Sequence, residues 1–548
     1  MTAEAGGRAQ LARRAGVVSA AVMASRVLGL VREQVFATFF GAGKELDAFI
    51  TAFRIPNLLR DLFAEGALSA AFVTTFTQEF ERKGESAAWR LASLVVNALA
   101  VVVGGLCLLG IWFAPAISRA IAPGFADVPG KLDLTIHLTR IMFPFLLLVA
   151  LAAVAMGVLN TRNYFGVPAA ASAFFNLGSV VGGLACMSWL APGYLGSIVA
   201  VMRGVAGPPP DPALTARAIT GMAIGTLLGG LLQLLVQVPS LLRVGYRYRP
   251  VVAVRDPALR QVMRLMAPAT IGAAAVQVNV FVNNNFASFL GNGPVSWLNV
   301  AFRLMQLPIG LFGVAIGTVT LPLISRQIAR GDEAAMRGAL RQALEMVALL
   351  CIPAAAGLAW FGVPVIGLIY EHGRFTAADT VAAARALAGY SIGLAGYAGI
   401  KVVAPAFYAL NDARTPMRVS LLSIVVNFCL NWLFVRVLGF GATGLALSTS
   451  AVALGNCGIL LVMLRQRLGP LGSGLGPALV RIGVATALML VAAAAVDATL
   501  AGWLPPRPVL HHGLRVVIVL PVAVAAFWAA CRALGIAVPT LRRRRSAG

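Results

Sequence analysis

The chain has 548 residues, of which 59% are hydrophobic and 12% are charged. A soluble protein carries about 25% charged residues, so this composition excludes an ordinary soluble globular fold. The formal net charge is +24. In a soluble chain that value would indicate a nucleic-acid partner. Basic loops that orient a membrane protein explain it here, so we expect no nucleic-acid partner.

Apolar segments recur along the whole chain, and each has roughly the 20 residues that a helix needs to cross a bilayer. Such spans must be helical because the hydrocarbon core offers no other partner for backbone hydrogen bonds. The sequence therefore predicts an all-α polytopic membrane protein with about fourteen transmembrane helices. The predicted spans are 15–40, 45–77, 90–113, 133–160, 166–189, 217–242, 260–289, 295–325, 338–361, 380–409, 417–437, 442–464, 475–500 and 514–536.

The first span is not typical of a cleaved signal peptide. It follows Arg8, Arg13 and Arg14, contains further arginines and lacks an A-x-A cleavage site. It is also longer than a signal h-region, so we predict a retained helix.

The loops between the predicted spans alternate in charge. Starting with the N-terminus, every second loop is basic, with about 24 Lys and Arg residues against about 8 in the other set. Basic loops stay in the cytoplasm. The asymmetry therefore predicts that both termini are cytoplasmic.

An internal repeat relates the two halves of the chain. AFRIPNLLRDLF begins at Ala52 and AFRLMQLPIGLF begins at Ala301, and Asn160 reappears as Asn411 at nearly the same offset. Six predicted spans separate the copies, so both copies have the same orientation, as in transporters built from parallel repeats. This predicts two parallel six-helix lobes in a pseudo-twofold arrangement plus two C-terminal helices. The predicted domains are an N-lobe of residues 1–250, a C-lobe of residues 251–468 and a helix pair in residues 469–548.

The first two spans carry many ionised side chains. Ionised groups at membrane depth cost several kcal/mol each unless they are paired or face water. A polar cavity that binds an anionic, lipid-linked substrate would account for this density. The charged residues of these spans are Arg26, Arg32, Glu33, Asp47, Arg54, Arg60, Asp61 and Glu65.

Four of these charges share one face of the second span. Asp47, Arg54 and Asp61 are seven residues apart, and Glu65 lies one turn beyond Asp61. Opposite charges in this order can neutralise one another and lower the cost of burial. The stripe is either a self-paired feature that fixes helix packing or a supporting charge network of the cavity. We favour the network because intramembrane ion pairs usually mark functional sites.

Deep arginines are the candidate substrate-binding residues. Arg26 lies well inside the first span, too deep to reach the interface readily, and Arg303 in the eighth span has no acidic neighbour in sequence. A guanidinium binds phosphate oxygens bidentately and stays charged, so several arginines at one cavity suit a pyrophosphate. We predict that Arg26, Arg32, Arg60 and Arg303 bind substrate. For each of them, a partner acid or backbone carbonyl is the alternative.

Other polar residues give weaker signals. Asn283, in the Asn283-Asn284-Asn285 run, either bridges helices or lines the cavity and takes part in ion coupling. Asp412 lies in a predicted cytoplasmic turn, where it caps a helix or, as the minority alternative, couples an ion. The four histidines show no metal spacing, and no Walker loop, HExxH or GxSxG is present. We therefore expect no metal, no cofactor and no catalytic residue.

Several motifs taken together resemble a known family. In these motifs, and over essentially the whole chain, the sequence resembles the MurJ (MviN) lipid II flippases of bacteria, in the multidrug/oligosaccharidyl-lipid/polysaccharide exporter superfamily. The motifs are Ser25-Arg26-Val27-Leu28-Gly29, Arg32-Glu33, Asp47-Ala48-Phe49, Pro56-Asn57-Leu58-Leu59-Arg60, Phe63-Ala64-Glu65-Gly66-Ala67, Ala122-Pro123-Gly124-Phe125 and Thr415-Pro416.

The resemblance implies a transporter of the bacterial cytoplasmic (inner) membrane rather than an enzyme. The implied substrate is lipid II, the undecaprenyl-pyrophosphate-linked peptidoglycan precursor, which the family moves from the inner to the outer leaflet for cell wall biogenesis. It also implies that Arg26, Arg32, Arg60 and Arg303 occupy the family's cavity-arginine positions, and that Asp47 occupies that of an important acid. The expected partners are lipid II, membrane lipids and peptidoglycan-synthesis or division proteins. Coupling to Na⁺, H⁺ or membrane potential stays open.

The chain departs from the family pattern beside Arg303. Some members have an acid directly before this arginine and another acid three residues after it, whereas this chain has Phe302 and Gln306. Acid-based coupling at this point is therefore in doubt, and Arg303 has fewer internal counterions.

Three other functions fit the sequence less well. A cation-coupled exporter of drugs or of another lipid-linked oligosaccharide, in the same superfamily, predicts an acidic or aromatic cavity rather than deep arginines. A membrane glycosyl- or phosphotransferase needs paired acids or a metal motif. A scaffold for synthesis enzymes explains the basic loops but not the charges inside the spans.

Overall fold

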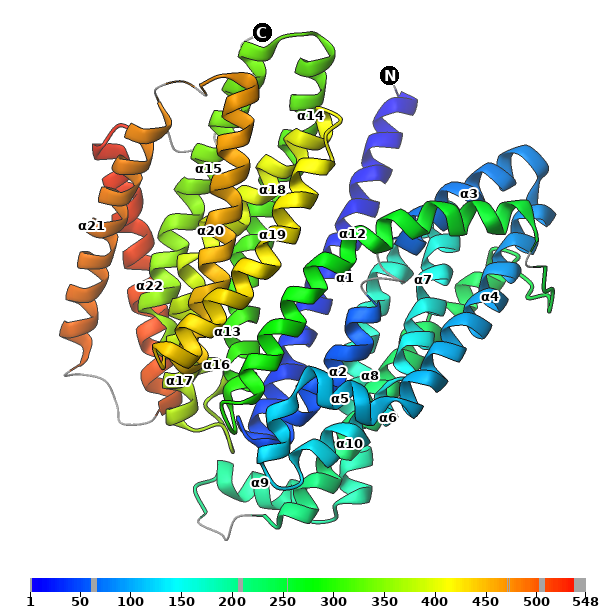
Figure 1. The fold of residues 1–548 in the computed structure, drawn as a ribbon, viewed down its shortest axis with the longest axis horizontal. Coiled ribbons are helices and arrows are strands. Elements are labelled where there is room, and N and C mark those ends of the chain that lie inside the picture. Colours follow the sequence, from blue (N-terminus) through cyan, green and yellow to red (C-terminus); the bar gives the residue numbers. More distant parts are fainter. Residues whose placement is uncertain are drawn as a thin grey trace. The chain divides into compact units, whose positions relative to one another are not determined.

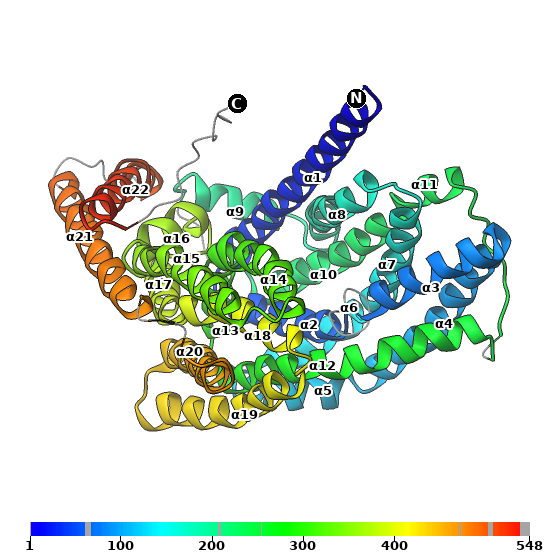
Figure 2. The same ribbon diagram turned by 90° about the horizontal axis from the view of Figure 1, so that it is seen from above.

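The computed structural model describes residues 2–60, 67–205, 210–253, 255–470, 472, 474–501 and 508–536. These residues form helices and turns and contain no β-strand, as the sequence predicts (Figures 1 and 2). Asp61 and Glu65 of the predicted charge stripe lie outside the described residues.

The helices follow one another along the chain with short connections. The first half contains α1 (Thr2–Phe40), α2 (Lys44–Arg60), α3 (Ala67–Lys83), α4 (Glu85–Trp112), α5 (Ala114–Ile121), η2 (Pro123–Asp127), α6 (Lys131–Met142), α7 (Phe145–Thr161), α8 (Gly166–Leu190), α9 (Tyr194–Met202), α10 (Pro212–Leu235) and α11 (Val238–Arg243). The second half contains α12 (Pro257–Ser288), α13 (Pro294–Pro308), η3 (Ile309–Gly313), α14 (Val314–Ala329), α15 (Glu333–Trp360), α16 (Gly362–Tyr370), α17 (Ala377–Ile392), α18 (Leu394–Ala409), α19 (Arg414–Asn431), η4 (Trp432–Val437), α20 (Gly441–Leu468), α21 (Leu475–Ala501) and α22 (Pro508–Ala533).

Eleven helical segments in the described part of the chain are long and apolar enough to cross a membrane. Each coincides with one predicted span. The three other predicted spans fall on α1, on α2 with α3, and on α12. The fold class is therefore as expected, and the count of fourteen is consistent with the helices.

Sequence signals explain where several helices begin. The side chain of Asp211 accepts a hydrogen bond from the backbone N–H of Ala213 at the start of α10, and Asp256 accepts one from Ala258 at the start of α12. A proline follows each of these aspartates. Such N-cap residues satisfy backbone donors that the helix leaves open, and proline is favoured at the first helical position.

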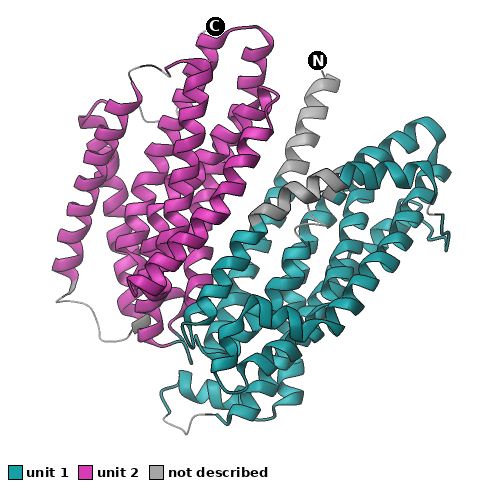
Figure 3. Ribbon diagram, in the orientation of Figure 1, with its two compact units in different colours: residues 1–296, 372–375 teal, residues 297–371, 376–548 magenta. Residues whose placement is uncertain are grey.

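Contacts divide the chain into two compact units (Figure 3). Unit 1 contains residues 1–296 and 372–375, and unit 2 contains residues 297–371 and 376–548. Unit 1 therefore includes α12 and the turn that follows it. This division describes contacts, whereas the domain boundaries predicted from the repeat stay a prediction.

Glycines allow the closest helix pairing in unit 1, between α8 and α10 (Figure 2). A Cβ atom on Gly225 would lie 2.2 Å from the Cα of Gly183, and one on Gly221 would lie 2.5 Å from the backbone nitrogen of Met187. Real side chains cannot approach a backbone so closely. The helices are thus held together by small residues, a common device where lipid supplies no hydrophobic drive between helices.

In unit 2, the last two helices pack against α15 and α16. Ile482, Met489, Val519 and Phe527 are buried in this cluster together with Leu349 of α15. Asp497 of α21 also accepts a hydrogen bond from Nε of Arg515 on α22, at 2.6 Å. The C-terminal helices are therefore an integrated part of this unit.

Candidate functional site

Aromatic packing fixes the hairpin that carries most of the predicted charges. α1 ends at Phe40 and α2 begins at Lys44, and Gly41 in the turn has φ +62°, a conformation that favours glycine. The ring of Phe36 lies 4.5 Å from that of Phe49 on α2. The apolar faces of the two helices thus hold the charged positions in a fixed relation within unit 1.

Arg26 and Arg32 lie on α1 in different surroundings. Arg26 is exposed on the protein surface. Arg32 is half-buried: its Nη2 lies 4.0 Å from Oε1 of Glu33, and its guanidinium lies 5.1 Å from the centroid of the Phe175 ring on α8. Glu33 and Phe175 therefore contribute to the environment of Arg32, through charge and a cation–π contact.

The other two predicted arginines lie on separate units. Arg60 is half-buried and is the last residue of α2 in unit 1. Arg303 is exposed on α13, in the part of this helix that belongs to unit 2. Substrate binding by Arg26, Arg32, Arg60 and Arg303 stays a prediction.

Arg54 takes an amide partner from α12. Its Nη1 donates a 2.9 Å hydrogen bond to Oδ1 of Asn284. Asn284 in turn donates to the carbonyl of Ile121, at 3.2 Å, and the neighbouring Asn285 donates to the carbonyl of Ala120, at 3.1 Å. The second and third asparagines of the run therefore bridge helices. Asn283 is half-buried on the same helix.

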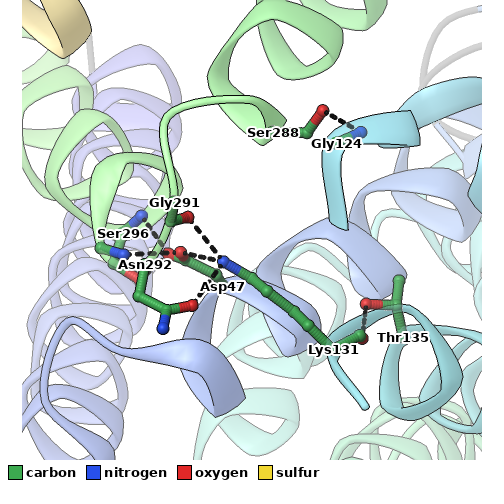
Figure 4. Close-up of polar contacts among 9 residues, drawn as sticks. Asp47, Gly124, Lys131, Thr135, Ser288, Gly291, Asn292 and Ser296 are labelled. Atoms are coloured by element: carbon green, nitrogen blue, oxygen red, sulfur yellow. Dashed lines mark hydrogen bonds and ion pairs between the residues drawn. The ribbon is translucent and has the colours of Figure 1, made fainter. Parts of the chain in front are cut away.

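Asp47 forms a buried ion pair that the sequence analysis missed (Figure 4). Its Oδ2 lies 2.9 Å from Nζ of Lys131 at the start of α6, and both side chains are 0% exposed. Oδ2 also accepts from the backbone N–H of Gly293, at 2.7 Å, while Oδ1 accepts from the N–H of Ser296, at 2.9 Å, and from its hydroxyl, at 2.6 Å.

The ammonium group of Lys131 is as fully engaged as the carboxylate. It donates to Asp47, to the carbonyl of Gly291, at 2.9 Å, and to Oδ1 of Asn292, at 3.1 Å. These three acceptors match the three protons of an ammonium group. Nζ also lies 4.2 Å from the centroid of the buried Phe125 ring, which adds a cation–π contact.

This pair gives Asp47 a partner that the sequence analysis did not foresee. The predicted network of Asp47, Arg54, Asp61 and Glu65 along α2 stays a prediction. Seven residues correspond to a rise of about 10 Å, so a partner from another helix can approach Asp47 more closely, and Lys131 does so. Removing one member of a buried pair costs about 3–5 kcal/mol because the other charge is left uncompensated.

No pattern in the sequence marked Lys131 as special. It begins an apolar span, where a lysine commonly extends its ammonium group into the interface. Its burial depends on the turn after α12, 160 residues further along the chain. A local pattern cannot show such an approach.

Asp412 caps a helix in unit 2. It accepts hydrogen bonds from the backbone N–H of Thr415, at 3.0 Å, and from the Thr415 hydroxyl, at 2.6 Å, and its Oδ2 lies 2.6 Å from Nη2 of Arg467. The hydrogen bonds from Thr415 lower the pKa of this carboxyl, and the charge of Arg467 adds to the effect. The structure therefore gives Asp412 the capping role that the sequence analysis preferred.

Two further observations bear on possible ligands. Within the described part of the chain, no group of three or more His, Cys, Asp or Glu side chains could hold a metal ion. A hollow of about 420 Å³ lies at the ends of α6, α8 and α10, and α6 is the helix that carries Lys131. Its charged lining consists of Asp133, His137 and Arg217.

Comparisons with known proteins agree on one family. The family described as "Lipid II flippase MurJ" matches residues 36–507. The chain is 36% identical to the lipid II flippase MurJ of Burkholderia cenocepacia over 454 residues, which cover 82% of this chain and 83% of that protein. It is 35% identical to the probable lipid II flippase MurJ of Vibrio cholerae over 452 residues, which cover 81% of each chain.

Solved structures support the same assignment. A structure described as lipid II flippase MurJ in an inward closed conformation has a TM-score of 0.74 and 26% identity, and the match covers 94% of this chain and 99% of that one. An inward-facing multidrug resistance MATE family transporter of the MOP superfamily has a TM-score of 0.66 at 14% identity, covering 83% and 98%, and shares the fold. The chain belongs to the lipid II flippase MurJ family.

Proposed function

We propose that this protein is a lipid II flippase that moves the undecaprenyl-pyrophosphate-linked peptidoglycan precursor from the inner to the outer leaflet of the bacterial cytoplasmic membrane. The observation that carries the proposal is the family match over residues 36–507. Cationic side chains inside apolar helices add chemical support, because an anionic pyrophosphate needs counter-charges to cross the apolar core of the bilayer.

Arginines supply the chemistry that this substrate needs. Arg26, Arg32 and Arg60 lie on α1 and α2, and Arg303 lies on α13. Each guanidinium would offer paired N–H donors to phosphate oxygens while staying charged at any physiological pH. The polyprenyl chain would remain in the lipid, so the protein would bind only the polar head of the substrate.

Transport would follow an alternating-access cycle, as in other repeat-built transporters. With both termini in the cytoplasm, the turns at 41–43, 128–130 and 289–293 would face the periplasm. The membrane potential could return an empty, positively charged cavity to the inward-facing state, since moving one charge is worth about 2.3 kcal/mol per 100 mV. Coupling to Na⁺ or H⁺ is the alternative source of energy for that step.

Complementation tests the proposal. Cells depleted of their own lipid II flippase should regain growth and normal shape when they express this chain. Failure to restore growth, with the protein present in the membrane, would contradict the proposal. Restored resistance to toxic cations without restored growth would instead favour a cation-coupled exporter.

A reporter fusion tests the orientation. A fluorescent or enzymatic reporter that is active only in the cytoplasm should be active when it is fused after Gly548. Activity only from a periplasmic reporter at this position would mean that the number of spans is odd.

A further inference from the structure

Three distant stretches of the chain meet at the Asp47–Lys131 pair, and all of them belong to unit 1. Asp47 comes from the first turn of α2, and Lys131 is the first residue of α6. The third stretch is the turn after α12 together with the first turn of α13 (Figure 4). We call the six residues that form this arrangement the clamp: Asp47, Lys131, Gly291, Asn292, Gly293 and Ser296.

The two charged side chains of the clamp bind different groups of one backbone segment: one binds N–H groups and the other binds a carbonyl group. Asp47 accepts from the N–H groups of Gly293 and Ser296, whereas Lys131 donates to the carbonyl of Gly291. Neither ion alone can bind both donors and acceptors of this turn. The pair therefore fixes the segment more completely than a contact between two helix side chains would.

The clamped segment has the composition of a hinge. Gly291 has φ +84° and Gly293 has φ +104°, conformations that residues with a side chain rarely adopt. A second contact holds the end of α12: the N–H of Gly124 donates to the hydroxyl of Ser288, at 3.1 Å. The hinge thus lies between a helix end that is anchored separately and a turn that the ion pair secures.

Burial makes the clamp a two-state element. Both charged side chains are 0% exposed, so a partly broken clamp would leave an unpaired ion in an apolar setting, which is strongly unfavourable. The structure shows the arrangement with all contacts made, and its opening would require both ions to separate together and become hydrated. Bistable contacts of this kind are what alternating conformations require.

We propose that Lys131 is a positioning residue for transport: it secures Asp47, and through it the 291–296 segment, in the state closed toward the periplasm, and the clamp releases when the protein opens to that side. The assignment of the periplasmic side and of the cycle rests on the proposed function. The role of Lys131 itself rests on the contacts of the clamp.

A labelling experiment measures whether the clamp opens. Val295 is 2% exposed in the first turn of α13, so Val295→Cys places a thiol inside the clamped segment. Intact cells that express this variant are treated with a membrane-impermeant maleimide, and the rate is compared with that of the parent chain. Adding Lys131→Met should accelerate labelling at position 295 roughly tenfold or more, because the clamped state loses an essential charge.

Matched variants distinguish opening of the clamp from unfolding of the protein. Lys44→Met is the control, because Lys44 bonds to the carbonyl of Pro129 at 2.7 Å in the same region but does not touch the clamp; it should leave the rate unchanged. Native Cys107 is buried on α4 and reports unfolding, so its labelling should stay slow in every variant. Asp47→Asn combined with Lys131→Met leaves no orphan charge, and its labelling rate should be close to that of Lys131→Met alone.

Two outcomes would overturn the inference. Equal labelling of position 295 with and without Lys131→Met would show that the ion pair is static packing. Acceleration at Cys107 as large as at position 295 would show that the substitution only loosens the fold. Labelling needs no substrate, so it remains informative if the parent chain fails to complement, and that failure alone concerns the proposed function.

Discussion

Nη1 of Arg54 donates a 2.9 Å hydrogen bond to Oδ1 of Asn284, which joins the middle of α2 to the second half of α12. Arg54 therefore has a buried partner on a helix far away in the sequence, and Asn284 links α2 to α12 within unit 1.

Replacing Asn284 tests this junction. Asn284 is 1% exposed, so Asn284→Ala removes hydrogen bonds to Arg54 and to the carbonyl of Ile121 from a buried site. We expect a loss of about 1–3 kcal/mol in the free energy of unfolding, seen as a lower apparent Tm of the purified protein. Asn285→Ala is the control, because its bond to Ala120 is exposed; an equal loss in both variants would contradict the role of Asn284.

Replacing each predicted binding arginine tests the site. Alanine at Arg26, Arg32, Arg60 or Arg303 should slow transport roughly tenfold to a hundredfold, the effect of losing a hydrogen bond between charged groups. Lysine should restore part of the activity, because it keeps the charge but not the paired donors. Complementation of flippase-depleted cells is the measurement, with membrane levels checked.

Arg203 provides the matched control for these arginines. It is exposed in the connection after α9, so Arg203→Ala should support normal growth. Full growth with Arg26, Arg60 and Arg303 all replaced by alanine would eliminate the proposed phosphate site.

The glycine contact between α8 and α10 predicts a packing effect. Gly225→Ala would force a methyl group into the backbone of Gly183, so the helices must separate at a cost of about 1–3 kcal/mol. Gly105→Ala on α4 is the comparison, because no atom lies within 4 Å of the added methyl group. Apparent Tm values should fall for the first variant only. Because alanine favours a helix more than glycine does, a similar fall for Gly105→Ala would show that the contact with Gly183 does not cause the loss.

The cap at Asp412 predicts a dependence on pH. Its pKa in the folded protein is lowered by hydrogen bonds from Thr415, with Arg467 contributing. The stability that it adds is therefore complete above its ordinary pKa of about 3.9 and is lost as the pH falls through the lowered value. The Tm difference between the parent and Asp412→Asn should be constant near neutral pH and should shrink in acid.

Removing Arg467 should shift the pH range over which the stabilisation by Asp412 is lost, which we call the acid window. Arg467→Gln takes away a favourable charge beside Asp412, so the acid loss should begin at a higher pH. Arg465→Gln, at an exposed position of the same helix, should leave the window in place. Identical windows in all three proteins would show that Arg467 does not act on Asp412.

Much of the fold followed from the sequence because helix formation in a membrane depends on local properties. Segment length, apolar content and the basic residues between segments specify where a span begins and ends. The charged side chains of the first two predicted spans, in turn, are the residues that suggested a substrate site.

The candidate site followed from the sequence only in part. The presence of Arg26, Arg32 and Arg60 on the first two helices was clear from the residues alone. The partners of Asp47 and Arg54 were not, because helical periodicity says which residues share a face and nothing about what approaches that face. Asn284 and Lys131 come from helices 230 and 84 residues away from their respective partners.

The sequence by itself determined the membrane class, the helical elements, the excess of cationic side chains and the resemblance to the flippase family. These properties depend on composition and on short motifs, which do not change when the chain folds. Only the tertiary structure decided that Lys131 neutralises Asp47 and that both hold the turn after α12. The physical reason is that a buried ion pair forms wherever packing brings opposite charges together out of water, and that meeting depends on the path of the whole chain.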